Sequence, residues 1–136
     1  MSVQELESGR RLLCVDDDRD SRYVLAALLR LEGYEVVATP NAREGVDLAK
    51  QGGFDAIILD NWLPEMTGID LCQMIRSFDS ETPILFYSAA AYQIDIKRAL
   101  AAGANGYLTK PTGIEELVRM VGELISRRKY RLEEIG

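Results

Sequence analysis

The stretch that decides the fold is residues 56–70, AIILDNWLPEMTGID. Its first four residues are apolar, and such a short run suits a strand that is buried on both faces of a sheet. Asp60 follows at once, and beyond the turn apolar residues recur with helical spacing. These recurring residues are Leu71, Met74, Ile75 and Phe78. The stretch therefore predicts a strand, a turn that begins with a carboxylate, and a helix.

The alternation of strand and helix continues on both sides of this stretch. Short apolar runs predict five strands, at Leu12–Val15, Val36–Ala38, Ala56–Leu59, Ile84–Tyr87 and Tyr107–Leu108. Helical spacing separates them, as at Val24, Ala27, Leu28 and Leu31. We therefore expect an α/β fold, (βα)5, with a doubly wound parallel sheet of the flavodoxin-like type and strand order 2-1-3-4-5.

The chain is long enough for one sizeable core, since it has 136 residues. We expect a loose leader at residues 1–10, the folded domain at 11–126, and a polar extension of the last helix at 127–136. Cys14 and Cys72 fall in apolar patterns, which favours small core residues over a disulfide or a metal site.

Composition excludes several classes of function. The apolar runs are too short to cross a bilayer, and the start of the chain lacks a signal peptide, so we expect a cytoplasmic protein with no membrane partner. The formal net charge of −6 predicts no direct nucleic-acid binding. The chain has no histidine, which excludes a phospho-histidine, a His-based catalytic triad and a His metal site.

Polar side chains follow four of the predicted strands at the point where each strand ends. They are Asp16, Asp17 and Asp18 after the first strand, Asp60 after the third, Ser88 after the fourth and Lys110 after the fifth. In open α/β sheets ligands bind at this edge. Singly, Asp18 is explained as a helix cap, Ser88 as a turn residue and Lys110 as a surface lysine. These explanations do not account for the shared position at strand ends.

Phosphoryl transfer accounts for the whole set. A carboxylate such as Asp60 can attack a phosphoryl donor and form an acyl phosphate, and the reaction needs alignment and neutralised charge. Asp16, Asp17 and Asp60 offer the oxygen ligands that Mg²⁺, or Mn²⁺ in its place, prefers. Lys110 would neutralise one phosphate oxygen, and Ser88 would donate to another. A bound metal would keep Asp60 ionised beside the other carboxylates, so the predicted site depends on metal.

Four segments in this order resemble the receiver domain of two-component response regulators. They are LLCVDDD (12–18), IILDNWLPEMTGID (57–70), PILFYSA (83–89) and GANGYLTKP (103–111). The resemblance spans residues 11–126 and implies a CheY-like phosphorylation switch with Asp60 as phosphoacceptor. The donor would be a phospho-histidine on a sensor histidine kinase or a histidine phosphotransfer protein. The chain would catalyse only its own phosphoryl transfer and dephosphorylation, and no other reaction.

The resemblance also assigns roles to single residues. Asp17 would bind Mg²⁺ directly, Asp16 mostly through water, and Trp62 through its backbone carbonyl. Ser88 and Lys110 would contact the phosphate, and Tyr107 would swing inward when the Ser88 hydroxyl moves. A packed strand aromatic explains Tyr107 equally well.

Three further implications concern the rest of the domain. Gly68 would let the loop turn into the third helix, and the bond before Pro111 would be cis. The face of the fourth helix, fifth strand and fifth helix would change on activation and meet a downstream protein or a second copy. The chain itself would be a single-domain regulator or a receiver cut from a longer parent.

Two pairs of positions are informative, one where the chain departs from the family pattern and one where the family varies. Asn105 and Gly106 stand where many DNA-binding members carry acidic residues that help to form a dimer, which puts that dimer in doubt. Trp62 and its companion Ala90 offer no polar group to position water, which predicts slow loss of the phosphoryl group.

Three rival functions stay open at this point. A pseudo-receiver would bind partners without phosphorylation, but it usually lacks one of the acidic, hydroxyl or lysine positions that this chain keeps. A haloacid-dehalogenase type of enzyme wants a second acid where Trp62 stands. A flavodoxin-like flavin binder wants a phosphate-cradling loop where this chain has three aspartates.

Overall fold

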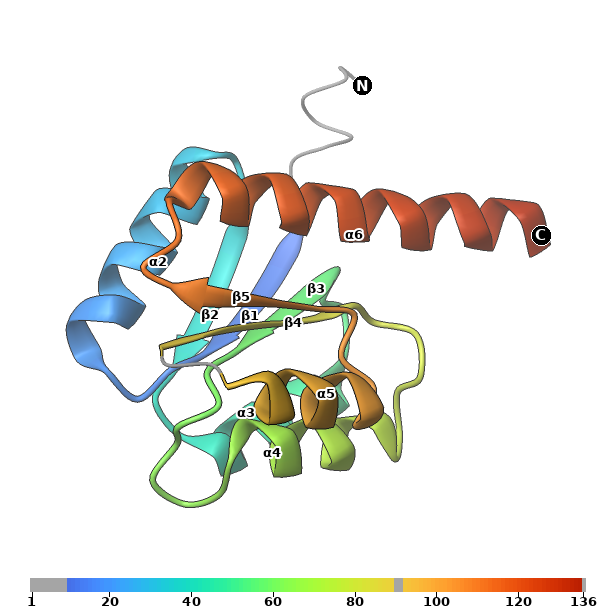
Figure 1. Ribbon diagram of the computed structural model, residues 1–136. Helices are drawn as coiled ribbons and strands as arrows, with labels where there is room; N and C mark the ends of the chain where they lie inside the picture. The colour runs from blue at the N-terminus through green and yellow to red at the C-terminus, as the bar shows by residue number, and fades with distance from the viewer. Residues whose placement is uncertain (1–9, 90–91, 136) are drawn as a thin grey trace.

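A five-stranded parallel sheet with helices on both faces forms the body of the molecule (Figure 1). The structure is a computed structural model and describes residues 10–89 and 92–135. The strands are β1 (Arg11–Val15), β2 (Glu35–Thr39), β3 (Ala56–Leu59), β4 (Ile84–Ala89) and β5 (Gly106–Lys110). Their order in the sheet is β2-β1-β3-β4-β5, which confirms the predicted topology.

Five helices connect and cover these strands. They are α2 (Arg19–Leu31), α3 (Ala42–Gln51), α4 (Gly68–Arg76), α5 (Gln93–Ala101) and α6 (Ile114–Ile135). Helices α2 and α6 lie on one face of the sheet, and α3, α4 and α5 lie on the other (Figure 1). Nearly all of the predicted leader lies outside the described residues, and α6 continues through most of the predicted polar extension. No helix in the described ranges combines the length and the apolar character needed to cross a membrane.

Two cores form because successive strand residues point to opposite faces of the sheet. Leu13, Ile57 and Phe86 pack under α3, α4 and α5. Leu12 and Ile58, one residue away in their strands, pack under α2 and α6. Both cysteines are buried in these cores, as expected. Burial on both faces explains why the strands read as continuous apolar runs.

The helix faces differ from those that the spacing predicted. Helix α2 buries Leu25, Ala26 and Leu29, whereas Val24 and Leu31 are 53% and 82% exposed. Helix α4 buries the predicted Leu71 and Ile75 together with Cys72, but Met74 is exposed, and so is Phe78, which lies beyond the end of the helix. Both helices carry more than one apolar stripe. Spacing alone therefore shows that each is a helix but does not show which stripe faces the sheet.

The loop between β3 and α4 folds closely back on the end of β3. The Gly68 N–H donates to the Asn61 carbonyl over 2.8 Å, and the Ile69 N–H donates to Asn61 Oδ1 over 3.3 Å. Thr67 and Asp70 form a capping box that starts the helix. A Cβ at position 68 would lie 2.4 Å from the Asp60 carbonyl oxygen. Only glycine lets the two backbone segments approach this closely.

We expect Gly68→Ala to lower the free energy of unfolding by about 1–3 kcal/mol, because the new methyl group must push backbone atoms apart. Gly122→Ala is the control, since a Cβ there meets nothing within 4 Å. This control should gain about 0.5–1 kcal/mol from its position inside a helix. Urea unfolding followed by circular dichroism measures both changes. An unchanged stability for Gly68→Ala would contradict the close approach.

Candidate functional site

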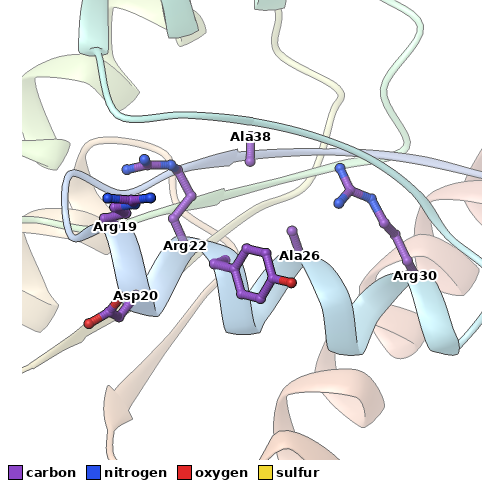
Figure 2. Close-up of a pocket in the computed structure, with 7 residues that line it drawn as sticks. Arg19, Asp20, Arg22, Ala26, Arg30 and Ala38 are labelled. Atoms are coloured by element: carbon purple, nitrogen blue, oxygen red, sulfur yellow. The ribbon is translucent and has the colours of Figure 1, made fainter.

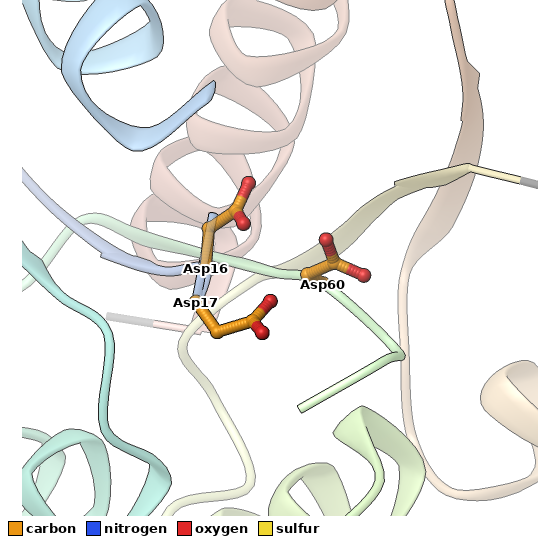
Figure 3. A group of neighbouring side chains, drawn as sticks. All are labelled: Asp16, Asp17 and Asp60. Carbon is orange, nitrogen blue, oxygen red and sulfur yellow. The ribbon is translucent and has the colours of Figure 1, made fainter. Parts of the chain in front are cut away.

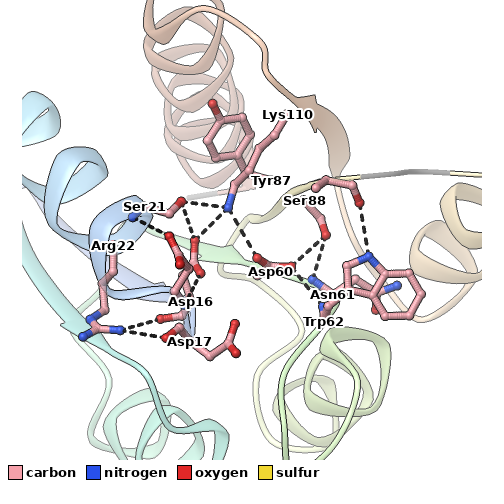
Figure 4. Close-up of polar contacts among 12 residues, drawn as sticks. Asp16, Asp17, Ser21, Arg22, Asp60, Asn61, Trp62, Tyr87, Ser88 and Lys110 are labelled. Atoms are coloured by element: carbon pink, nitrogen blue, oxygen red, sulfur yellow. Dashed lines mark hydrogen bonds and ion pairs between the residues drawn. The ribbon is translucent and has the colours of Figure 1, made fainter.

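The candidate site lies at the carboxyl ends of the strands, where four of them bring polar side chains together (Figure 4). Asp16 directly follows β1, and Asp60 directly follows β3. Val15 and Leu59, the residues before them, are register partners in the parallel ladder. Lys110 is the last residue of β5, and Ser88 lies near the end of β4. The sheet thus gathers residues that are far apart in the sequence.

Three carboxylates meet at this edge (Figure 3). One ligand oxygen from each of Asp16, Asp17 and Asp60 lies within 4.8 Å of the others. Asp16 and Asp60 are only 3% and 8% exposed, whereas Asp17 is open to solvent. Negative groups this close repel one another, so the cluster needs a cation.

Lys110 supplies one positive charge to the cluster. Its Nζ lies 2.8 Å from Asp16 Oδ2 and 3.3 Å from Asp60 Oδ2. The ammonium also lies 5.3 Å from the centre of the Tyr87 ring. Burial lowers the pKa of Lys110, but the hydrogen bonds and charges of Asp16 and Asp60 outweigh burial and raise it above its ordinary value. The lysine is therefore held in its charged form. The Lys110–Pro111 peptide bond is cis, as expected.

The second oxygen of Asp60 is held by neutral donors. Ser88 Oγ donates to Asp60 Oδ1 over 2.7 Å, and the Trp62 backbone N–H donates to the same oxygen over 2.9 Å. The Asn61 N–H donates in turn to Ser88 Oγ over 3.3 Å. Asp60 therefore sits at the centre of donors that come from β4, β5 and its own loop.

The donor set fits a small divalent cation with oxygen ligands. The two oxygens of Asp16 already accept hydrogen bonds from Asp18, Ser21 and Lys110. The carboxylate of Asp17 makes no hydrogen bond or ion pair with the described part of the chain. Asp17 is thus the carboxylate most open to direct coordination, and Asp16 the one better suited to bind through water. These two roles, and the carbonyl of Trp62 as a ligand, stay predictions.

Tyr107 points into the molecule beside the site. Its ring stacks on Phe86 with centroids 5.4 Å apart and an angle of 9° between the planes. The hydroxyl is buried without a hydrogen-bond partner in the described residues. Burial raises the pKa of this phenol, and the charges of Asp95 and Asp60 add to the rise, whereas the nearby Ser88 side chain opposes it. Packing explains the position of the ring, and the movement of Tyr107 stays a prediction.

The side chain of Trp62 bridges two loops at the edge of the site. The indole Nε1–H donates to the Ala89 carbonyl over 3.1 Å, and 48% of the residue is exposed. The only polar group of this side chain is therefore engaged with the end of β4. Ala90, its predicted companion, lies outside the described residues.

The sequence analysis missed two residues on the first turn of α2. Ser21 Oγ donates to Asp16 Oδ2 over 3.0 Å and accepts from Lys110 Nζ over 2.9 Å. Arg22 Nη1 donates to the Asp16 carbonyl over 2.9 Å. Asp18 is the N-cap of α2, so the first turn of this helix begins only three residues after Asp16. The expected cap at Asp18 was therefore a signal that residues 21 and 22 lie near Asp16, and the strand-end rule does not include it.

Comparisons with known proteins agree on one family. The sequence model of the response regulator receiver domain matches residues 12–122. The transcriptional regulatory protein YkoG of Bacillus subtilis is 35% identical over 96% of this chain and 57% of its own length. The cell cycle transcriptional regulator CtrA of Caulobacter vibrioides is 34% identical over 92% of this chain and 54% of its own length.

One similar solved structure contains a metal ion. The receiver domain of the sensor histidine kinase PA1611 from Pseudomonas aeruginosa is 33% identical, with a TM-score of 0.81, and covers 88% of this chain and 99% of its own. That structure holds a magnesium ion in its active-site cleft. The cluster of Asp16, Asp17 and Asp60 fits the Mg²⁺ site typical of receiver domains.

The relatives correct the expected set of partners. The acidic net charge predicted no direct nucleic-acid binding, but YkoG and CtrA are both named transcriptional regulators. This chain spans little more than half the length of these curated relatives. The prediction was wrong, because the net charge of a stretch of this length does not show what proteins of this family bind.

We expect the Ser21 hydroxyl to stabilise the cluster by about 1–2 kcal/mol, because it contacts two charged groups in a partly buried place. Ser21→Val removes the hydroxyl, and Ser21→Thr keeps it in a side chain of nearly the same shape. Thermal unfolding should therefore place Ser21→Val below Ser21→Thr. Equal stability of the two variants would show that the contacts with Asp16 and Lys110 contribute nothing.

Proposed function

Because the chain belongs to the family of response regulator receiver domains, we propose that it is a signalling switch with Asp60 as phosphoacceptor. The observation that carries this proposal is the set of donors around the Asp60 carboxylate. Lys110, Ser88 and the Trp62 backbone N–H all contact it from different directions. A lone structural aspartate needs no such set, whereas a group that gains a phosphoryl group does.

The proposed reaction transfers a phosphoryl group from the nitrogen of a phospho-histidine to Asp60. A carboxylate oxygen of Asp60 forms the new bond to phosphorus while the phosphorus–nitrogen bond breaks, and the electron pair stays on the imidazole. The donors that now contact Asp60 would turn to the phosphoryl oxygens. Lys110 neutralises charge on one of them, and Ser88 and the Trp62 N–H each donate to another.

Mg²⁺ bound by Asp17 and Asp60, with Asp16 behind water, would neutralise the oxygens of the incoming group. Support for this ion comes from the carboxylate cluster and from the engaged state of Asp16. Lys110 alone cannot balance three carboxylates, so we propose that phosphorylation depends on the metal.

The proposed switch runs from Ser88 to Tyr107. Ser88 Oγ would leave Asp60 for a phosphoryl oxygen, and this movement changes the space beside the buried Tyr107 ring. Phe86 and Tyr107 are register partners on β4 and β5, so a shift in one strand end reaches the other. The face that would respond is formed by α5, β5 and α6. A preference of a few kcal/mol for one arrangement is enough for such a change.

Phosphorylation by a small acyl phosphate, such as acetyl phosphate, tests this function directly. We expect the intact mass to rise by one phosphoryl group in the presence of Mg²⁺, because Asp60 then has both a donor and a balanced charge. Asp60→Asn should abolish this rise, whereas Asp47→Asn, which removes an exposed carboxylate on α3, should leave it unchanged. Removal of Mg²⁺ by a chelator should also abolish it. A folded, Mg²⁺-binding protein that never gains mass would instead be a pseudo-receiver.

The Trp62 side chain should slow the loss of the phosphoryl group. Its ring lies beside Asp60, and its N–H is occupied by Ala89, so it presents no polar group that could position an attacking water. We expect Trp62→Asn to shorten the lifetime of the acyl phosphate several-fold. Trp62→Phe keeps an apolar ring and should keep the slow decay. Lifetimes follow from intact mass measured after the donor is removed, and equal decay in all three proteins would refute the idea.

A further inference from the structure

A groove lined by arginines lies along α2, on the side that faces the outer strand β2 (Figure 2). Its volume is about 470 Å³, which is within the range of sites for small molecules. The lining residues are Arg19, Asp20, Arg22, Tyr23, Ala26, Arg30 and Ala38. Arg19 and Arg22 lie at one end, Arg30 lies at the other, and Ala26 and Ala38 lie between them (Figure 2). None of the three clustered carboxylates lines the groove, which adjoins the cluster through the bonds of Arg22 to the Asp16 and Asp17 carbonyls.

The sequence positions explain how the groove forms. Arg19, Arg22, Tyr23, Ala26 and Arg30 recur at the three- and four-residue intervals that place side chains on one face of a helix. Alanine at positions 26 and 38 leaves the middle of the groove open, because neither α2 nor β2 places a long side chain there. The long arginine side chains stand at its ends.

The arginine charges of this groove are not neutralised by ion pairs within the described residues. None of the three arginines forms an ion pair with the described part of the chain. Arg22 donates to the backbone carbonyls of Asp16 and Asp17, and Arg30 donates to that of Val36; such contacts leave a guanidinium charge in place. Asp20 is the one acidic residue of the lining, so the groove keeps an excess of positive charge on a chain whose net charge is −6.

An aromatic ring stands beside these charges. Tyr23 is 76% exposed, an unusual state for a large aromatic side chain on a helix that has a buried face available. Arginine binds phosphate oxygens through two parallel N–H donors, and an exposed aromatic ring stacks on a planar base. We propose that this groove binds a nucleoside diphosphate, with its phosphates on Arg19 and Arg22 and its base against Tyr23.

Arg22 limits the choice of test variants. It also holds the carbonyl of Asp16, so replacing it would disturb the carboxylate cluster. Arg19 makes no contact with other described side chains and can be changed without that effect. Arg98 is an exposed arginine on α5, away from the groove, with no contact of this kind either. Arg98→Gln therefore removes the same charge as Arg19→Gln and serves as its matched control.

Calorimetric titration of the whole chain with adenosine diphosphate, pyrophosphate and adenosine tests the proposal. Measurements in the presence of a chelator exclude binding through Mg²⁺ at the carboxylate cluster. We expect the diphosphate to bind more tightly than either fragment. Arg19→Gln should weaken it about tenfold, since one charge-assisted contact is lost. Tyr23→Ala should weaken it about fivefold or more and leave pyrophosphate unchanged, since base stacking is lost.

Three results would overturn the proposal. Equal affinity for pyrophosphate and adenosine diphosphate, with no effect of Tyr23→Ala, would mean a simple anion site. Equal weakening by Arg19→Gln and Arg98→Gln would mean attraction by net charge alone. If a short oligonucleotide bound more tightly than adenosine diphosphate, and Tyr23→Ala did not change its affinity, the ligand would be a nucleic-acid backbone. These outcomes are independent of whether Asp60 accepts a phosphoryl group, because the titration involves no phosphoryl donor.

Discussion

The site depends on the two ion pairs that Lys110 makes, one with Asp16 and one with Asp60. Both carboxylates are almost completely buried, and two buried negative groups this close are unstable without a cation between them. The lysine reaches them because β5 ends beside β4 and across the site from β1. The same ammonium therefore ties together the ends of three strands, and the site cannot form unless the sheet is complete.

The parallel sheet makes this arrangement almost unavoidable once the strand order is set. With β1 and β3 adjacent at the centre, the residues that follow them must leave the sheet side by side. Ser88 and Lys110 then join from the neighbouring strands on one side only. Helix α2 closes the other side with Ser21 and Arg22, which contact Asp16 and Asp17 rather than Asp60. The site is thus divided into a half that holds the carboxylates and a half that surrounds the acceptor.

The site residues that could be predicted from the sequence are those whose place depends only on their position along a strand. Asp16, Asp60 and Lys110 were predicted because each lies at the carboxyl end of a strand, and in a parallel sheet these ends share one edge. The spacing missed the buried face of α2 and found that of α4 only in part, at Leu71 and Ile75, because both helices are apolar on more than one side. Ser21 was missed for a related reason. Its role depends on the angle at which α2 leaves β1, and that angle comes from a cap and from packing rather than from any local pattern.

The net charge of the site links the proposed metal ion to the proposed movement of the Ser88 hydroxyl. Three carboxylates and one ammonium leave two negative charges before any reaction. An acyl phosphate on Asp60 replaces one negative charge with a group that carries about −1.5 to −2, so the deficit grows. A divalent ion held by Asp17 and Asp60 would offset part of this charge. The phosphoryl oxygens would also attract the nearest donors, and the Ser88 hydroxyl could turn toward them without breaking an ion pair. The proposed movement of Ser88 beside Tyr107 thus follows from the charge that the reaction would add to the site.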